Sequence, residues 1–138
     1  MTETKHTSVF DLFGTDRTAE EEGKWIKFGT EIEIKIRRYK SRHTINMQRT
    51  LERPFEQMRR KGVLPQDIAE QVLHGMICKS IVVDWKGIYD REGNEIPFSP
   101  EAADALLTEL TELRDNIVST SMDMDNFRQN SDEDVGKN

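Results

Sequence analysis

Apolar and charged side chains alternate without interruption between residues 31 and 37. Isoleucine occupies every second position, and charged side chains fill the positions between. A period of two places alternate side chains on the same face of a β-strand, so the segment predicts a strand buried on one side. Residues 25–28 form an earlier strand candidate, and Gly29-Thr30 between the two allows a tight turn. The pattern therefore predicts a β-hairpin.

The apolar face of this hairpin needs a cover, because a lone hairpin is only marginally stable in water. That cover is formed either by helices of the same chain or by the sheet of a second copy. The hairpin could in addition extend a sheet across subunits. The candidate self-association residues are then Ile32, Ile34 and Ile36.

Three longer segments have the spacing of amphipathic helices. Residues 41–61 predict the first, although Pro54 should bend or restart it. The second begins at Pro65 and repeats apolar residues every three or four positions, which predicts a helix to about Val83 or Trp85. The third begins at Ser99-Pro100, and one further turn can follow it. The predicted fold class is α+β, mostly α-helical: an N-terminal β-hairpin followed by three or four helices.

Composition divides the chain into one domain and two tails. Residues 1–22 are polar and acidic, which favours a disordered N-terminal tail. Residues 23–128 form a single α+β domain, and residues 129–138 form an acidic, disordered C-terminal tail. The N-terminal tail also holds a short apolar cluster that could instead dock on another surface: Val9, Phe10, Leu12 and Phe13.

The net charge of −6 hides a strong asymmetry along the chain. Residues 1–23 carry a net charge of −4, residues 24–61 a net charge of +8, and residues 62–138 a net charge of −10. A basic middle segment can bind a phosphate backbone. It can equally bind an acidic surface of a protein partner or of another copy. We favour a protein surface as the partner, because the acidic flanks would repel nucleic acid.

The sequence shows no constellation of residues that points to catalysis. None of the three histidines has the spacing of a metalloprotease site, and the glycines are too scattered for a phosphate-binding loop. Cys78 stands among apolar residues of the second helix, where a small buried hydrophobe is the preferred interpretation. We therefore expect no enzyme activity, catalytic residue, cofactor or metal. No apolar run approaches the roughly 18–20 residues of a membrane helix, so we expect no membrane association.

Two consecutive segments resemble the tail assembly chaperones of long-tailed, siphovirus-type bacteriophages. They are Ile81-Val-Val-Asp-Trp-Lys-Gly-Ile88 and Asp90-x-x-Gly93-Asn-Glu-Ile-Pro97-Phe-Ser-Pro100. The leucine-rich helix after them, the alternating strand and the basic pair Arg37-Arg38 are similar to the same family. The resemblance spans about residues 23–127.

The resemblance implies a non-enzymatic role in the host cytoplasm. Such proteins bind the tape measure protein, keep it soluble, promote polymerisation of the tail tube protein, and are absent from the mature virion. The resemblance also implies a homo-oligomer. Many members are additionally made in a longer, frameshifted form that links to the tail tube protein. Val135-Gly136-Lys137 is compatible with a slippery codon heptamer, a hypothesis that the gene sequence decides.

Six large apolar residues near the resembling segments are candidates for the contact with this client. They either face the client or cover the third helix and close the core: Trp85, Ile88, Phe98, Met122, Met124 and Phe127. The alternative function is that of a small nucleic-acid-binding or regulatory protein, which would use the basic surface of residues 35–60.

Overall fold

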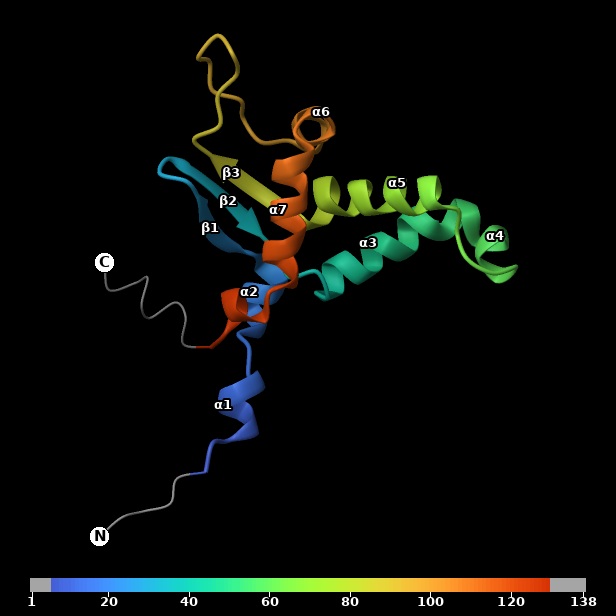
Figure 1. Ribbon diagram of the computed structural model, residues 1–138, viewed down its shortest axis with the longest axis horizontal. Helices are drawn as coiled ribbons and strands as arrows, with labels where there is room; N and C mark the ends of the chain where they lie inside the picture. Colours follow the sequence, from blue (N-terminus) through green and yellow to red (C-terminus); the bar gives the residue numbers. More distant parts are fainter. Residues whose placement is uncertain (1–5, 130–138) are drawn as a thin grey trace.

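The protein is a mostly helical α+β structure, as the sequence predicts, and it is built on a three-stranded antiparallel sheet (Figure 1). The computed structural model describes residues 6–129. The sheet has the order β1-β2-β3, with β1 at Lys24–Phe28, β2 at Ile32–Ile36 and β3 at Val82–Lys86. The β1–β2 hairpin is confirmed, and its register pairs Lys24 with Ile36. Within residues 6–129, no helix is long and apolar enough to cross a bilayer.

The isoleucine face of β2 is covered by helices of the same chain. Ile34 and Ile36 are completely buried, and Ile32 packs against the edge of the same core. The covering side chains come from α6 (Pro100–Glu109), α7 (Thr111–Met122) and the π-helical turn η2 (Ile77–Ile81). The prediction of a self-association surface is therefore wrong for Ile34 and Ile36, because the chain's own helices already remove them from water, whereas Ile32 is only partly buried.

The strand β3 replaces the end of a predicted helix. Helix α5 spans Gln66–Met76 and continues into η2, after which the chain becomes extended at Val82. The sequence predicted helix to about Val83 or Trp85. That prediction is wrong, because the second edge of β2 takes up this segment, pairing Ile34 with Trp85 and Ile36 with Val82. The branched side chains of residues 81–83 suit a strand better than a helix.

Several packed helices form an arm that projects from the sheet (Figure 1). It comprises α3 (Arg42–Glu52), the 3-10 turn η1 (Arg53–Phe55), α4 (Glu56–Arg60) and α5. Pro54 lies in η1, where the predicted helix indeed restarts. At its base the arm is tied to η2 by buried hydroxyl groups, since Thr44 Oγ1 lies 3.0 Å from Ser41 Oγ and 2.9 Å from Ser80 Oγ. Arm and sheet are thus parts of one packed structure.

Two short helices occupy residues for which the sequence favoured a disordered tail. They are α1 (Val9–Phe13) and α2 (Arg17–Glu22), capped by Ser8 and Asp16. Helix α2 has a buried anchor in Ala19, and the backbone N–H of Asp16 donates to the Phe127 carbonyl at 2.7 Å. Tertiary contacts that are distant in sequence therefore order this segment. Residues 1–5, and residues 130–138 of the predicted acidic tail, lie outside the described residues.

A glycine at position 87 is required where β3 leaves the sheet. Its φ is +77°, and an added Cβ would lie 2.1 Å from the Glu31 carbonyl oxygen. We expect Gly87→Ala to lower the free energy of unfolding by about 3 kcal/mol or more. The matched control is Gly93→Ala, because Gly93 also has a positive φ but open space around it. It should cost only about 1 kcal/mol. Urea denaturation measures both, and equal losses would contradict the close contact at Gly87.

Candidate interaction surfaces

The segments that resemble tail assembly chaperones form an interlocked part of the core. The indole Nε1–H of Trp85 donates to the Ile96 carbonyl at 2.7 Å. The Phe98 ring meets the indole edge-on, with ring centroids 5.1 Å apart. Trp85 and Ile88 are each only 6% exposed, and Phe98 packs against the same core. These three predicted client contacts therefore hold the β3–α6 connector on the sheet; Trp85 and Ile88 are buried there, and Phe98 is partly exposed.

The turn within this connector is built by its own side chains. Asp90 Oδ1 accepts hydrogen bonds from the backbone N–H groups of Glu92 at 3.0 Å and Asn94 at 2.8 Å. Ser99 then caps α6 by accepting from the Ala102 N–H at 2.9 Å. The Asp-Gly turn and the Ser-Pro helix start thus have structural roles, which explains why they occur together.

The second group of predicted client contacts divides between core and surface. Phe127 is completely buried, and Met124 is partly buried. Met122 is 51% exposed, and it lines a cavity of about 290 Å³ with Arg38, Tyr39 and Lys40. Among the six candidate residues, Met122 is the one that remains largely accessible to a partner.

Helix α1 presents an apolar surface to solvent, and we call it the apolar hook. Its four large apolar side chains are all about half exposed or more, with Phe10 at 78% and Phe13 at 67%. The hook projects from the body beside the C-terminal end of the described chain (Figure 1). Arg128 anchors it, because Nη1 of Arg128 lies 2.9 Å from the Leu12 carbonyl and 3.3 Å from the Asp11 carbonyl. The structure thus fixes the backbone of the hook and leaves its side chains uncovered.

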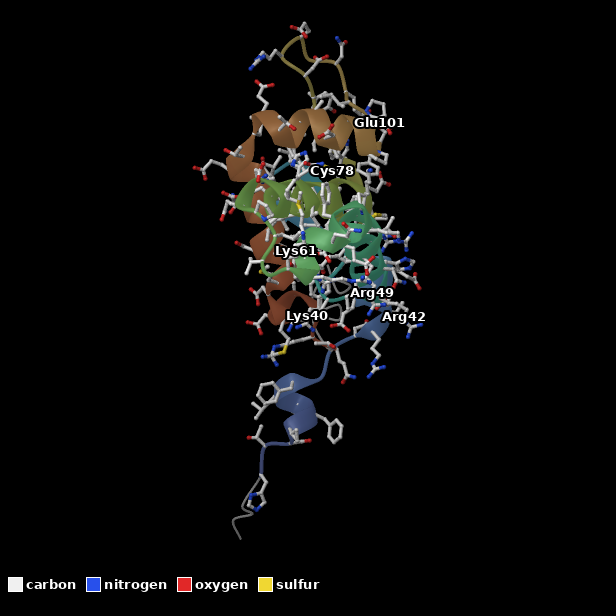
Figure 2. All side chains as sticks on the ribbon, turned by 90° about the vertical axis from the view of Figure 1, so that its right-hand side faces the viewer. Lys40, Arg42, Arg49, Lys61, Cys78 and Glu101 are labelled. Atoms are coloured by element: carbon white, nitrogen blue, oxygen red, sulfur yellow. The ribbon has the colours of Figure 1, made fainter. Side chains whose placement is uncertain are left out.

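Arginine side chains form a stripe along the arm. Arg42, Arg49 and Arg53 are spaced by seven and four residues, which places them on one side of a helix. Figure 2 labels Arg42 and Arg49 on the same side of the arm. A groove of about 280 Å³ beside the stripe is lined by Arg49, Arg53 and Arg59, but also by Glu52 and Glu56. Its charge is therefore mixed.

A cysteine, a histidine and an aspartate meet between α5 and α6. His74 Nε2 lies 2.7 Å from Asp104 Oδ1, 3.3 Å from Thr108 Oγ1 and 3.6 Å from Cys78 Sγ. A catalytic triad needs the two ring nitrogens to face different partners, whereas all three groups here face Nε2. Burial, together with the smaller effect of nearby Asp104, raises the pKa of the Cys78 thiol to about 11. The thiol is therefore protonated near neutral pH and is a poor nucleophile.

The sequence did not reveal this cluster, because Asp104 lies 30 residues after His74. The three residue types can also bind a metal ion, and their donor atoms lie within 4.8 Å of one another. The His74–Asp104 hydrogen bond gives the arrangement a structural role, since it joins α5 to α6.

Comparison with known proteins places the chain in a phage context. Residues 39–138 match the family model of the YdaY prophage protein. The chain belongs to the YdaY prophage protein family. The matched region includes the arm, the connector and α6–α7, and it begins after the apolar hook and the β1–β2 hairpin. No curated protein and no solved structure matches the chain. The family description states a prophage origin, which agrees with the phage resemblance, and it states no activity.

The raised pKa of Cys78 predicts slow modification by thiol reagents. At pH 8, raising the pKa from 9.0 to about 11 lowers the thiolate fraction roughly 100-fold. We expect the native protein to react at least that much more slowly than the urea-unfolded chain, as followed by absorbance with an aromatic disulfide reagent. The Cys78→Ser variant is the blank, because Cys78 is the single cysteine. Equal rates for folded and unfolded protein would show that folding neither shields the thiol nor raises its pKa.

Proposed function

We propose that this protein is a phage tail assembly chaperone that binds the tape measure protein and keeps it soluble. The proposed role is non-enzymatic: reversible binding of a long helical client and promotion of tail tube polymerisation. The prophage family supports the phage context, and the resembling segments support the tail assembly role. The contact with the client is assigned to the apolar hook.

The apolar hook is the observation that carries this proposal. A contiguous group of exposed apolar side chains on a small, highly charged protein marks an interaction site. A helix of five residues is too short to be stable by itself, so its order depends on the Arg128 anchor. Full burial of one such side chain contributes about 1.5–3 kcal/mol, so several together can hold a client reversibly. An apolar helix of the client has the matching chemistry.

Met122 extends the proposed client surface beyond the hook. It ends α7, and only the turn η3 (Met124–Phe127) separates α7 from Arg128, which anchors the hook. Methionine packs against varied apolar partners because its side chain is flexible and polarisable. The buried Phe127 supports this surface indirectly, because its carbonyl accepts a hydrogen bond from the backbone N–H of Asp16 just after the hook.

The wider assembly role is part of the same proposal. We place the protein in the host cytoplasm and outside the mature virion, with the tail tube protein as a second partner through a longer frameshifted product. The segment Val135-Gly136-Lys137, where the frameshift would occur, lies outside the described residues.

The arginine stripe of the arm favours nucleic-acid binding as the second candidate function. A stripe of this kind can track a phosphate backbone. Two carboxylates lie in the groove beside the stripe, however. Glu52 pairs with Arg59 at 3.4 Å, and Glu56 pairs with Arg60 at 3.1 Å. These pairs lower the positive potential of the groove, so we rank this function below client binding.

Co-expression with the tape measure protein of the same phage genome tests the proposed function. The wild-type chain should keep the client soluble and elute with it. A variant with Phe10→Ser and Phe13→Ser should keep its fold, because both side chains are exposed, and should recover less than about a tenth of the soluble client. Gel filtration of the soluble fraction, with quantification of both chains, gives the result.

The matched control is Asp11→Ser, which changes the same helix without removing an apolar side chain. It should behave as the wild type does. If the client stays insoluble with the wild type, and the chain instead retains nucleic acid until salt removes it, the second candidate function replaces the first. If the phenylalanine variant matches the wild type, the hook is not the client site.

A further inference from the structure

The tip of the arm is both basic and apolar. We define the arm tip as residues 53–63, which carry four basic side chains and one acidic side chain. Val63 is 93% exposed and Met58 is about half exposed, so apolar groups stand among the positive charges. In Figure 1 the tip, which includes α4, is the outermost part of the arm. A surface complementary to the arm tip would carry both apolar and acidic side chains.

The β3–α6 connector and α6 form a surface of the opposite character. Tyr89, Ile96, Leu106 and Leu110 line a cavity of about 290 Å³, and Tyr89 and Leu110 are largely exposed. Its rim carries Asp90, Glu92 and Glu109 against a single arginine, Arg91. We call this the acidic pocket. A cavity of roughly 150 Å³ can hold a benzene ring, so the acidic pocket has room for a valine or methionine side chain.

These two complementary surfaces cannot meet within one molecule. The arm tip lies at the far end of the arm, whereas the connector lies beyond the sheet, and they are separated in both views (Figures 1 and 2). The arm base is fixed to η2 by the contacts of Thr44 with Ser41 and Ser80. The arm therefore cannot swing to its own pocket without breaking that buried junction.

We propose that the arm tip of one copy docks into the acidic pocket of a second copy of this chain. Val63 and Met58 enter the apolar floor of the pocket. Lys61 faces the carboxylates of Glu92 and Glu109 at its rim. Arg59 and Arg60 exchange their partners Glu52 and Glu56 for these carboxylates, and Glu109 exchanges its ion pair with Arg91. Such exchange costs little, because surface ion pairs contribute little to stability. The charge complementarity of the two surfaces selects a second copy as the occupant, because one chain carries both halves of the contact. The interface is heterologous, so it forms a closed ring or an open row of copies.

This association replaces the self-association that the sequence predicted through the isoleucines of β2. It uses neither the apolar hook nor Met122, so it leaves the proposed client surface free on every copy. It goes beyond client binding and does not depend on it, because it can be measured on the purified protein without any client.

Analytical ultracentrifugation of two charge-reversal variants tests the proposal. The wild-type chain should sediment above its monomer mass of 16.1 kDa and grow with concentration. A tip variant, Arg60→Glu with Lys61→Glu, should be monomeric. A pocket variant, Glu92→Lys with Glu109→Lys, should also be monomeric. All four side chains are exposed, so the fold should survive, and circular dichroism verifies this.

The decisive sample is an equimolar mixture of the two variants. The tip variant keeps an intact pocket, and the pocket variant keeps an intact tip. The mixture should therefore assemble beyond the monomer, because the intact tip meets the intact pocket and the reversed tip meets the reversed pocket, each pair with opposite charges. A reversal of two lysines elsewhere, Lys27→Glu with Lys79→Glu, controls for net charge and should assemble as the wild type does.

Three results would overturn the proposal. They are a wild-type chain that is monomeric up to about 100 μM, variants that assemble as the wild type does, and a mixture that stays monomeric although each variant is folded. Failure of client binding by the hook variant changes none of these readings, so the two proposals are tested separately.

Discussion

The structure depends on the burial of one face of β2. Ile34 and Ile36 have no exposed surface, and the chain buries them with its own η2 turn and with α6 and α7. Covering this face requires α5 to stop at Met76 and the chain to return along β2 as β3. That return places Trp85 under the connector, where its hydrogen bond to the Ile96 carbonyl fixes the path into α6. Hydrophobic burial at one strand thus determines the topology.

Because this face of β2 is buried, the surfaces that can bind a partner lie at the periphery of the molecule. Trp85 and Ile88, the large apolar residues of the first resembling segment, are buried against the core, so they are not available as a contact surface. What remains accessible is the apolar hook at one place, and the arm tip and acidic pocket at two others. A small protein can in this way separate a client surface from a self-association surface. The buried Cys78 thiol is protonated near neutral pH, and the hydrogen bond of His74 to Asp104 joins α5 to α6.

The sequence predicts the parts of this fold that depend on local periodicity. Strict alternation identifies β2, and capping residues identify α3 and α6. The η2–β3 junction escapes prediction, because a short apolar run has the same appearance in a buried helix and a buried strand. The order of α1 and α2 depends on contacts with Phe127 and Arg128, more than a hundred residues away. The sequence did not decide whether Trp85 is exposed, because the connector that covers it is a loop without a periodic pattern of apolar residues.

Hydrogen exchange of the chain, free and bound to the tape measure protein, tests the central claim most directly. If the apolar hook is the client surface, the amides of residues 9–13 should exchange rapidly in the free protein and become protected in the complex. Those of β2 should be protected in both states, because they belong to the core. Unchanged exchange in α1, with new protection along the arm instead, would contradict the account and move the client to the basic surface.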